Sequence, residues 1–252
     1  MKQTVTPLSL VETMPLFAGI GADDLADAAG AAHVSRHLKG ETLLAAGEAA
    51  LRFCLIVDGW AGLRKGNAEG HESILQIIGA RDFFPDFAPA GRMQSLTDIV
   101  ALTPVTVVSF AIGFIRDLCG RSAHFTRNLM SENMRRARDM QDHIEQLTLH
   151  DAERRVGWFL LRLRQQGGSC GVDIDLPFEK AVIASYLGIK PETLSRALHH
   201  LRGKGISGTR ASVTLPDAQA LCVYCNERTA HDCPQADTAH CPQITGEVME
   251  PV

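Results

Sequence analysis

The stretch FEKAVIASYLGIKPETLSRALHHLRGK, residues 178–204, decides the fold of the second half of this chain. Three apolar residues at helical spacing predict a first short helix: Val182, Ile183 and Leu187. Gly188 then supplies a turn, and Pro191 suits the first position of a second helix, because it lacks an N–H and its φ is fixed. The buried stripe of that second helix is predicted to be Leu194, Ala197, Leu198 and Leu201. The stretch therefore predicts two helices joined by a tight turn.

A second face of the later helix carries polar side chains. Glu192, Ser195 and Arg196 are spaced i, i+3 and i+4, close to the N-terminus of the helix. In a helix-turn-helix, the N-terminal residues of the second helix contact base edges in the major groove. Arginine pairs with guanine, glutamate accepts from cytosine N4, and serine can serve either base. The alternative is an ordinary surface helix with a Glu–Arg pair.

Charge favours contact with nucleic acid. Residues 178–210 contain only two acidic residues, Glu179 and Glu192, and have a net charge of +4. The whole chain has a net charge of −4, so the remainder carries −8. The six basic residues of the segment are Lys180, Lys190, Arg196, Arg202, Lys204 and Arg210. A basic segment in an acidic protein is typical of phosphate contact.

The segment resembles the winged helix-turn-helix of the Crp/Fnr family of bacterial transcription regulators. Residues 192–196, ETLSR, are similar to the E-x-x-S-R recognition helix of the Fnr branch, and Ile206–Leu215 would form the wing. The resemblance implies that Glu192, Ser195 and Arg196 contact bases of a TTGAT-like half-site in double-stranded DNA. It also implies RNA polymerase as a partner. We predict four further DNA contacts: Lys190, Thr193, Arg202 and Lys204.

The first half of the chain has a different pattern. Residues 9–32 are predicted to be largely helical. From His37 to Phe110, short apolar runs separated by glycines predict about eight strands in a jelly roll. The spacing of Gly40, Gly47 and Gly59 resembles the cyclic-nucleotide-binding β-roll of the same family. The predicted fold class is therefore α+β, with a β-roll before the winged helix-turn-helix.

The roll departs from the family in its phosphate pocket. In cAMP binders a Gly-Glu pair and an Arg-Ser pair hold the cyclic phosphate. The corresponding region here reads GARDFFPD, residues 79–86, and Arg92 and Ser95 are separated by two residues. We therefore predict that the roll does not bind cAMP and is either a scaffold or a site for another ligand.

Residues 125–149 predict one long helix. Apolar residues recur alternately at three and four residues, as in a coiled-coil seam. The residues of this seam are Met130, Asn133, Ala137, Met140, Ile144 and Leu147. A single amphipathic helix lying on its own core is the alternative. We predict a homodimer whose interface includes Met130, Ala137, Met140, Ile144 and Leu147, because a palindromic operator requires two-fold symmetry.

Four of the seven cysteines lie near the C-terminus, as Cys222, Cys225, Cys233 and Cys241. Their spacing is C-x2-C-x7-C-x7-C, and four thiolates can hold a metal ion or an iron–sulfur cluster. A disordered acidic tail with reactive thiols is the alternative. We predict four domains: a β-roll with flanking helices (1–122), a dimerisation helix (123–149), a winged helix-turn-helix (150–215) and a cysteine-rich tail (216–252).

The cofactor follows in part from the resemblance. The Fnr branch senses oxygen with a 4Fe–4S cluster, and some relatives place cluster cysteines after the wing, as in this tail. The resemblance therefore implies an iron–sulfur cluster of the 4Fe–4S type, with zinc as the alternative. A haem-containing or zinc-stabilised regulator with a small ligand in the roll stays open, as does an iron–sulfur redox protein.

Several classes of protein are disfavoured. The N-terminal residues, MKQTVTPLSL, contain no apolar signal region, and the longest uncharged run is too short for a membrane span. We therefore expect a cytoplasmic protein. No nucleophile–base set or glycine-rich phosphate loop is apparent, so no enzyme is predicted. Cys54 lies in an apolar strand and is expected to be a core residue.

Overall fold

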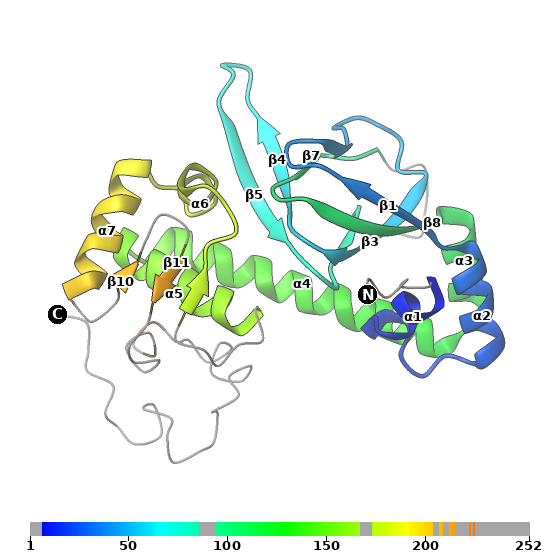
Figure 1. The fold of residues 1–252 in the computed structure, drawn as a ribbon. Helices are drawn as coiled ribbons and strands as arrows, with labels where there is room; N and C mark the ends of the chain where they lie inside the picture. Colours follow the sequence, from blue (N-terminus) through cyan, green and yellow to red (C-terminus); the bar gives the residue numbers. More distant parts are fainter. Residues whose placement is uncertain are drawn as a thin grey trace, which may run out of the picture. The chain divides into compact units, whose positions relative to one another are not determined.

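A computed structural model describes residues 7–85, 94–166, 173–203, 207–208, 212–214, 222 and 224. The chain divides into two compact units, residues 1–141 and 142–252 (Figure 1).

The first unit contains a β-roll made of two four-stranded sheets. One sheet has the order β1-β8-β3-β6 and the other the order β2-β7-β4-β5. Their bounds are β1 His33–His37, β2 Thr42–Leu44, β3 Arg52–Asp58, β4 Ala61–Gly66, β5 Glu72–Ile78, β6 Phe83–Phe84, β7 Asp98–Ala101 and β8 Val105–Ala111. All pairings are antiparallel. The predicted roll of about eight strands is confirmed over the described residues.

The roll contributes to two apolar cores, because strands of its first sheet have buried residues on both faces. Between the sheets, residues such as Ile56, Ile78 and Val107 form one core. The outer face of the first sheet packs its Phe53 and Phe110 against helices. These helices are α1 Pro7–Glu12, η1 Pro15–Phe17, α2 Ala22–Ala31, α3 Ile112–Arg121 and the start of α4. Alternation of side chains along β3 and β8 therefore places residues in both cores.

One turn of the roll depends on glycine. Gly59 joins β3 to β4 with φ +84°, in the left-handed region. A Cβ at this position would lie 2.1 Å from the carbonyl oxygen of Pro104. Gly40 and Gly47 also have positive φ, so all three glycines of the spacing that predicted the roll occupy left-handed turns.

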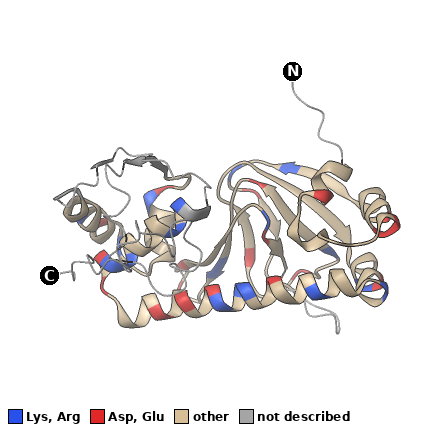
Figure 2. Cartoon of the chain, turned by 90° about the horizontal axis from the view of Figure 1, so that it is seen from below, with Lys and Arg blue, Asp and Glu red and all other residues tan. Residues whose placement is uncertain are grey.

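The long helix α4 runs from Ala123 to Leu149, as the seam pattern predicted. Its first part belongs to the first unit and its last turns to the second. Figure 2 shows that residues of both charges, Lys or Arg in blue and Asp or Glu in red, alternate along this helix. Among the described helices, none is long and apolar enough to cross a membrane.

The second unit is a winged helix-turn-helix. After α4 come α5 Ala152–Gln166, β9 Asp173–Asp175, α6 Lys180–Tyr186 and α7 Pro191–Gly203. The wing follows as β10 Ser207–Gly208 and β11 Ser212–Thr214, which pair antiparallel within the predicted range. The sequence analysis did not anticipate β9, which adds a third strand beside β11. Three residues are too few for a periodic pattern, so only the pairing reveals this strand.

Candidate nucleic-acid interface

The turn between α6 and α7 is fixed by a glycine cap. Gly188 has φ +61°, and its N–H donates to the Ser185 carbonyl oxygen at 3.2 Å. The next N–H, from Ile189, donates to the Ala184 carbonyl oxygen at 3.0 Å. These two bonds form a Schellman motif, which ends α6 sharply. The second helix then begins at Pro191, and the Leu194 N–H donates to the Lys190 carbonyl oxygen at 3.0 Å.

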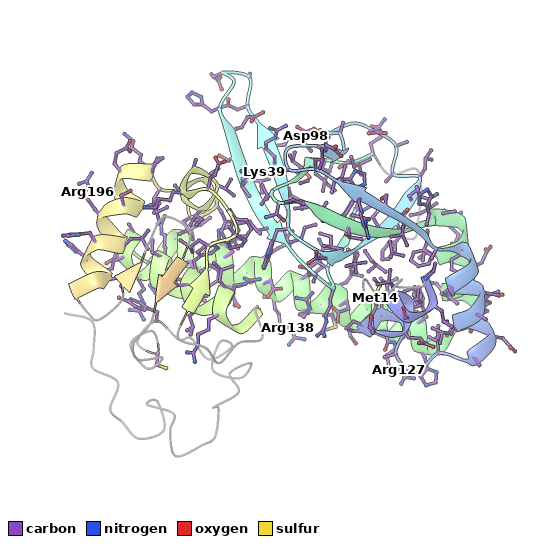
Figure 3. The ribbon with its side chains drawn as sticks, viewed as in Figure 1. Met14, Lys39, Asp98, Arg127, Arg138 and Arg196 are labelled. Carbon is purple, nitrogen blue, oxygen red and sulfur yellow. The ribbon has the colours of Figure 1, made fainter. Side chains whose placement is uncertain are left out.

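Helix α7 has one buried and one exposed face. Leu194 and Leu201 are buried, at 1% and 0% exposure, and Ala197 lies with them. Glu192, Ser195 and Arg196 are exposed. Figure 3 shows the Arg196 side chain on the outer side of α7. The structure therefore brings the three predicted base-contacting residues together on one accessible face.

The residues that flank this face differ in their exposure to solvent. Lys190 is exposed before the first turn, whereas Thr193 is half-buried. His199 is exposed, seven residues after Glu192 and so on the same face. Arg202 lies in the last turn of α7, and Lys204 lies outside the described residues.

Arg155 of α5 ties the helix-turn-helix to the end of α4. Its guanidinium donates to the carbonyl oxygens of His150 (2.9 Å), Leu187 (3.1 Å) and Leu147 (2.7 Å). Leu147 lies in the last turn of α4, His150 directly follows α4, and Leu187 directly follows α6. At helix ends such carbonyl oxygens have no intrahelical donor. One arginine thus fixes α6 relative to α4 and α5 within the second unit.

His143 of α4 lies in the aromatic centre of the same unit. It is buried, its Nε2–H donates to the Tyr186 carbonyl oxygen at 2.8 Å, and its ring stacks on the Tyr186 ring at 4.0 Å. Trp158 lies parallel to it at 6.2 Å. Burial lowers the pKa of His143; the bond to Tyr186 opposes this, and the nearby Arg162 and Arg155 add to it. Neutral imidazole therefore suits this site. The sequence analysis found no role for His143, since nothing in its spacing marks it.

The outer side of α4 carries an apolar stripe. Met130 and Ile144 are 62% and 58% exposed, and Ala137 and Met140 are also exposed. Met134, 58% exposed, lies on the same stripe but outside the predicted seam. The remaining seam residues, Asn133 and Leu147, are half-buried. The Asn133 amide donates to the Leu129 carbonyl oxygen, and the Leu147 side chain lies close to Gly188.

Of the predicted metal ligands, only Cys222 is described, and it is half-buried. Cys225, Cys233 and Cys241 lie outside the described residues. Within the described part of the chain, no group of three or more His, Cys, Asp or Glu side chains is arranged to hold a metal ion. Burial raises the pKa of the Cys54 thiol to about 12, so Cys54 is a protonated core residue as expected. Burial also raises the pKa of Cys119.

The turn between β5 and β6, which the sequence analysis compared with the family's phosphate pocket, contains a hydrogen-bonded carboxylate. Asp82 Oδ2 accepts from the Gly79 N–H at 2.9 Å, and its Oδ1 accepts from Arg135 at 2.7 Å. Ser95 is buried and its hydroxyl donates to the Thr97 carbonyl oxygen at 2.6 Å. Arg92 lies outside the described residues. The absence of cAMP binding in the roll stays a prediction.

Comparison with known domains agrees with both units. Residues 35–122 match the cyclic nucleotide-binding domain, and residues 154–224 match the Crp-like helix-turn-helix domain. The first match covers the strands of the roll together with α3, and the second begins in α5 and includes α6, α7 and the wing.

Similar proteins are regulators of transcription. A CRP-like cAMP-activated global transcriptional regulator of Mycobacterium tuberculosis is 30% identical over 192 residues, which cover 73% of this chain and 84% of that protein. The cyclic AMP receptor protein of Thermus thermophilus is 23% identical over 192 residues, 76% of this chain and 87% of that protein. The structure of FixK2 from Bradyrhizobium japonicum superimposes with a TM-score of 0.68 at 25% identity, covering 75% of this chain and 95% of that one. The family consists of transcription regulators, which bind DNA as dimers, and not of enzymes. The chain belongs to the Crp/Fnr family of transcriptional regulators.

Proposed function

We propose that this regulator binds, as a homodimer, a palindromic operator with a TTGAT-like half-site. Glu192, Ser195 and Arg196 contact bases, and Lys190, Thr193, Arg202 and Lys204 contact the backbone around them. The observation that carries the proposal is the exposure of the first three side chains on one face at the N-terminal end of α7. That end of a recognition helix is the part that enters the major groove.

The dimer forms along the apolar stripe of α4, with Met130, Ala137, Met140, Ile144 and Leu147 in or beside the contact. Four of these five side chains are exposed in the single chain. Exposed methionine and isoleucine at three- and four-residue spacing support pairing with a second copy of the helix. A two-fold dimer presents two α7 helices to two half-sites, as a palindrome requires.

The regulatory signal acts through the C-terminal cysteines, which hold an iron–sulfur cluster, with oxygen, NO or iron supply as the signal. This rests on the spacing of Cys222, Cys225, Cys233 and Cys241. Burial raises the pKa of Cys54 and of Cys119, which makes these two thiols poor metal ligands. RNA polymerase is the partner through which the bound dimer alters transcription.

The DNA proposal is tested by gel shift with Arg196→Ala. This variant should lose about 1–3 kcal/mol on a TTGAT palindrome and discriminate less at the guanine. Arg116→Ala, which removes an exposed arginine from α3, is the matched control and should bind as the wild type does. Lys204→Ala should weaken all sequences alike and flatten the salt dependence. Full preference for TTGAT in Arg196→Ala would contradict the assignment.

The signal is tested by the absorption spectrum of the anaerobically purified protein. A brown chromophore with matching iron and sulfide supports the cluster, and Cys222→Ser should abolish it. A colourless protein that contains zinc would favour the zinc-stabilised alternative. Two relatives carry cAMP in their names, so cAMP is titrated in parallel. A rise in operator affinity with cAMP would show that the signal enters through the roll.

A further inference from the structure

Tyr224, which stands between Cys222 and Cys225 in the sequence, is seated against helix α5. The side chain is buried, at 4% exposure. Its ring lies directly over Gly157, in the interior of α5. A Cβ at Gly157 would lie 2.3 Å from the ring, closer than any real contact. The ring can occupy this position only because residue 157 has no side chain.

Gly157 differs in this respect from other helical glycines of the chain. Gly113 and Gly120 of α3 have nothing within 4 Å of an added Cβ. A glycine inside a helix costs up to about 1 kcal/mol relative to alanine. At Gly157 that cost is offset by the buried tyrosine ring, so the glycine forms a notch that fits Tyr224.

The hydroxyl group of Tyr224 is connected to α7 through the carboxylate of Glu153. It donates to Glu153 Oε1 at 3.4 Å. The other oxygen of the same carboxylate, Oε2, lies 3.3 Å from Nδ1 of His200 in α7. Glu153 of α5 therefore contacts both Tyr224 and the helix that carries Arg196.

We propose that Tyr224 is an anchor by which the C-terminal segment docks on the DNA-binding unit, and that docking strengthens DNA binding. The ring in the Gly157 notch holds the segment, and the hydroxyl steadies Glu153, which orients α7 through His200. This rests on the proposed role of α7 in binding DNA. Tyr224 then regulates the DNA-binding site itself, because any event that displaces Tyr224 removes its hydrogen bond to Glu153 and so weakens the positioning of α7.

Docking is tested first, without DNA, on the full-length protein. Chymotrypsin cleaves after tyrosine, so a seated Tyr224 should be protected and an unseated one cut, releasing residues 225–252 for mass measurement. Gly157→Ala fills the notch while favouring the helix, and should speed this cleavage by at least about 5-fold. Gly120→Ala, a helical glycine in open space, is the control and should leave the rate unchanged. Equal rates in Gly157→Ala and wild type would overturn the anchor.

The link to α7 is tested by fluorescence anisotropy on operator and on unrelated DNA. Gly157→Ala and Tyr224→Ala should each weaken operator binding by at least about 5-fold, and the double variant should be no weaker than either, since both remove one contact. Tyr224→Phe should stay protected from chymotrypsin yet bind the operator more weakly than wild type. Faster cleavage with wild-type affinity, or wild-type affinity in Tyr224→Phe, would overturn the link through Glu153.

The two proposals fail separately. If wild-type protein does not prefer the operator over unrelated DNA, the proposed DNA function is wrong, and the cleavage rates still decide the anchor. If the wild type prefers the operator but Gly157→Ala matches it in both assays, only the anchor is wrong.

Discussion

The two parts of α4 are held by different chemistry. In the first unit, after the apolar residues at its start, α4 contacts the segment around β6 through arginines. Arg136 is only 4% exposed, its guanidinium donates to the Phe83 carbonyl oxygen at 2.8 Å, and it lies 4.5 Å from the centre of the Phe83 ring. Arg135 pairs with Asp82 (2.7 Å), Glu132 (2.8 Å) and Asp139 (3.0 Å). This part of the helix is therefore fixed to the segment around β6 by cations.

In the second unit the buried side of α4 holds no such cation. Its buried basic group is His143, stacked on Tyr186 and hydrogen-bonded to the carbonyl of that residue. Burial favours the neutral ring there. The positive charge comes instead from Arg155 of α5, which donates to backbone carbonyls at the helix ends.

The contacts of α4 in the two units should therefore respond differently to pH. Burial opposes the charge of Arg135, but the carboxylates of Asp82 and Glu132 outweigh it and raise the pKa of Arg135, so the charge persists at every working pH. Burial, by contrast, disfavours the charged form of His143, although the hydrogen bond to the Tyr186 carbonyl oxygen favours it. A fall in pH should therefore act on the second unit and spare the first.

The largest expected effect concerns the exposed apolar stripe, which runs along both parts of α4. Ile144→Glu places a charge in the exposed stripe, and burying it in a dimer would cost several kcal/mol. The variant should sediment as a monomer at micromolar concentration with unchanged circular dichroism. Arg116→Glu, which changes an exposed arginine of α3 and lies outside α4, is the control and should remain a dimer. A dimeric Ile144→Glu would show that the subunits meet elsewhere.

Arg136→Ala should have the next largest effect, on the first unit alone. Losing a charge-assisted hydrogen bond and a buried cation–π contact should lower the free energy of unfolding by about 3 kcal/mol. The two tryptophans report the units separately, because Trp60 lies in the roll and Trp158 in α5. In urea, Trp60 fluorescence should therefore change at lower concentration. A variant as stable as exposed Arg138→Ala would remove the contrast between the two parts of α4.

Arg135→Ala should have a smaller effect in the same unit. Its side chain is 39% exposed, so solvent screens its three ion pairs. Their combined loss should destabilise the unit by about 1 kcal/mol, and added salt should reduce this difference. A loss as large as that in Arg136→Ala would mean that the ion pairs, and not the buried arginine, hold this part of α4.

The smallest effect should appear as a pH dependence of the second unit. Because the folded pKa of His143 lies below its ordinary value of 6.5, its contribution to stability is complete above that value and is lost as the pH falls through the folded pKa. Urea unfolding followed by Trp158 fluorescence in a Trp60→Phe background should show this between about pH 8 and about pH 5. His143→Gln should flatten the dependence. An equal loss on acidification in wild type and His143→Gln would exclude this residue as its source.

The exposed polar face of α7 could be predicted because it depends on spacing alone. Glu192, Ser195 and Arg196 fall on one face of any helix that begins at Pro191, and Leu194 and Leu201 fix which face is buried. The stripe on α4 was predicted less completely. Leu147 falls on the predicted seam but its side chain lies near Gly188 of the second unit. Met134 falls outside the predicted seam but is exposed on the same stripe. The spacing of apolar residues identifies which face of a helix is apolar. The side chains that pack against the helix decide which residues lie at the edges of that face.

The sequence by itself determined the elements: the strand–glycine pattern of the roll, the length of α4, and the two helices around Gly188. These follow from local rules, since periodicity and left-handed glycines act over a few residues. Only the tertiary structure decided which distant groups meet. It placed Asp82 against Arg135, put His143 between aromatic rings, and seated Tyr224 over Gly157. His143 and Tyr186 are 43 positions apart in the sequence, Asp82 and Arg135 are 53 apart, and Tyr224 and Glu153 are 71 apart. No pattern along the chain encodes such pairs, because they arise when separate elements pack against one another.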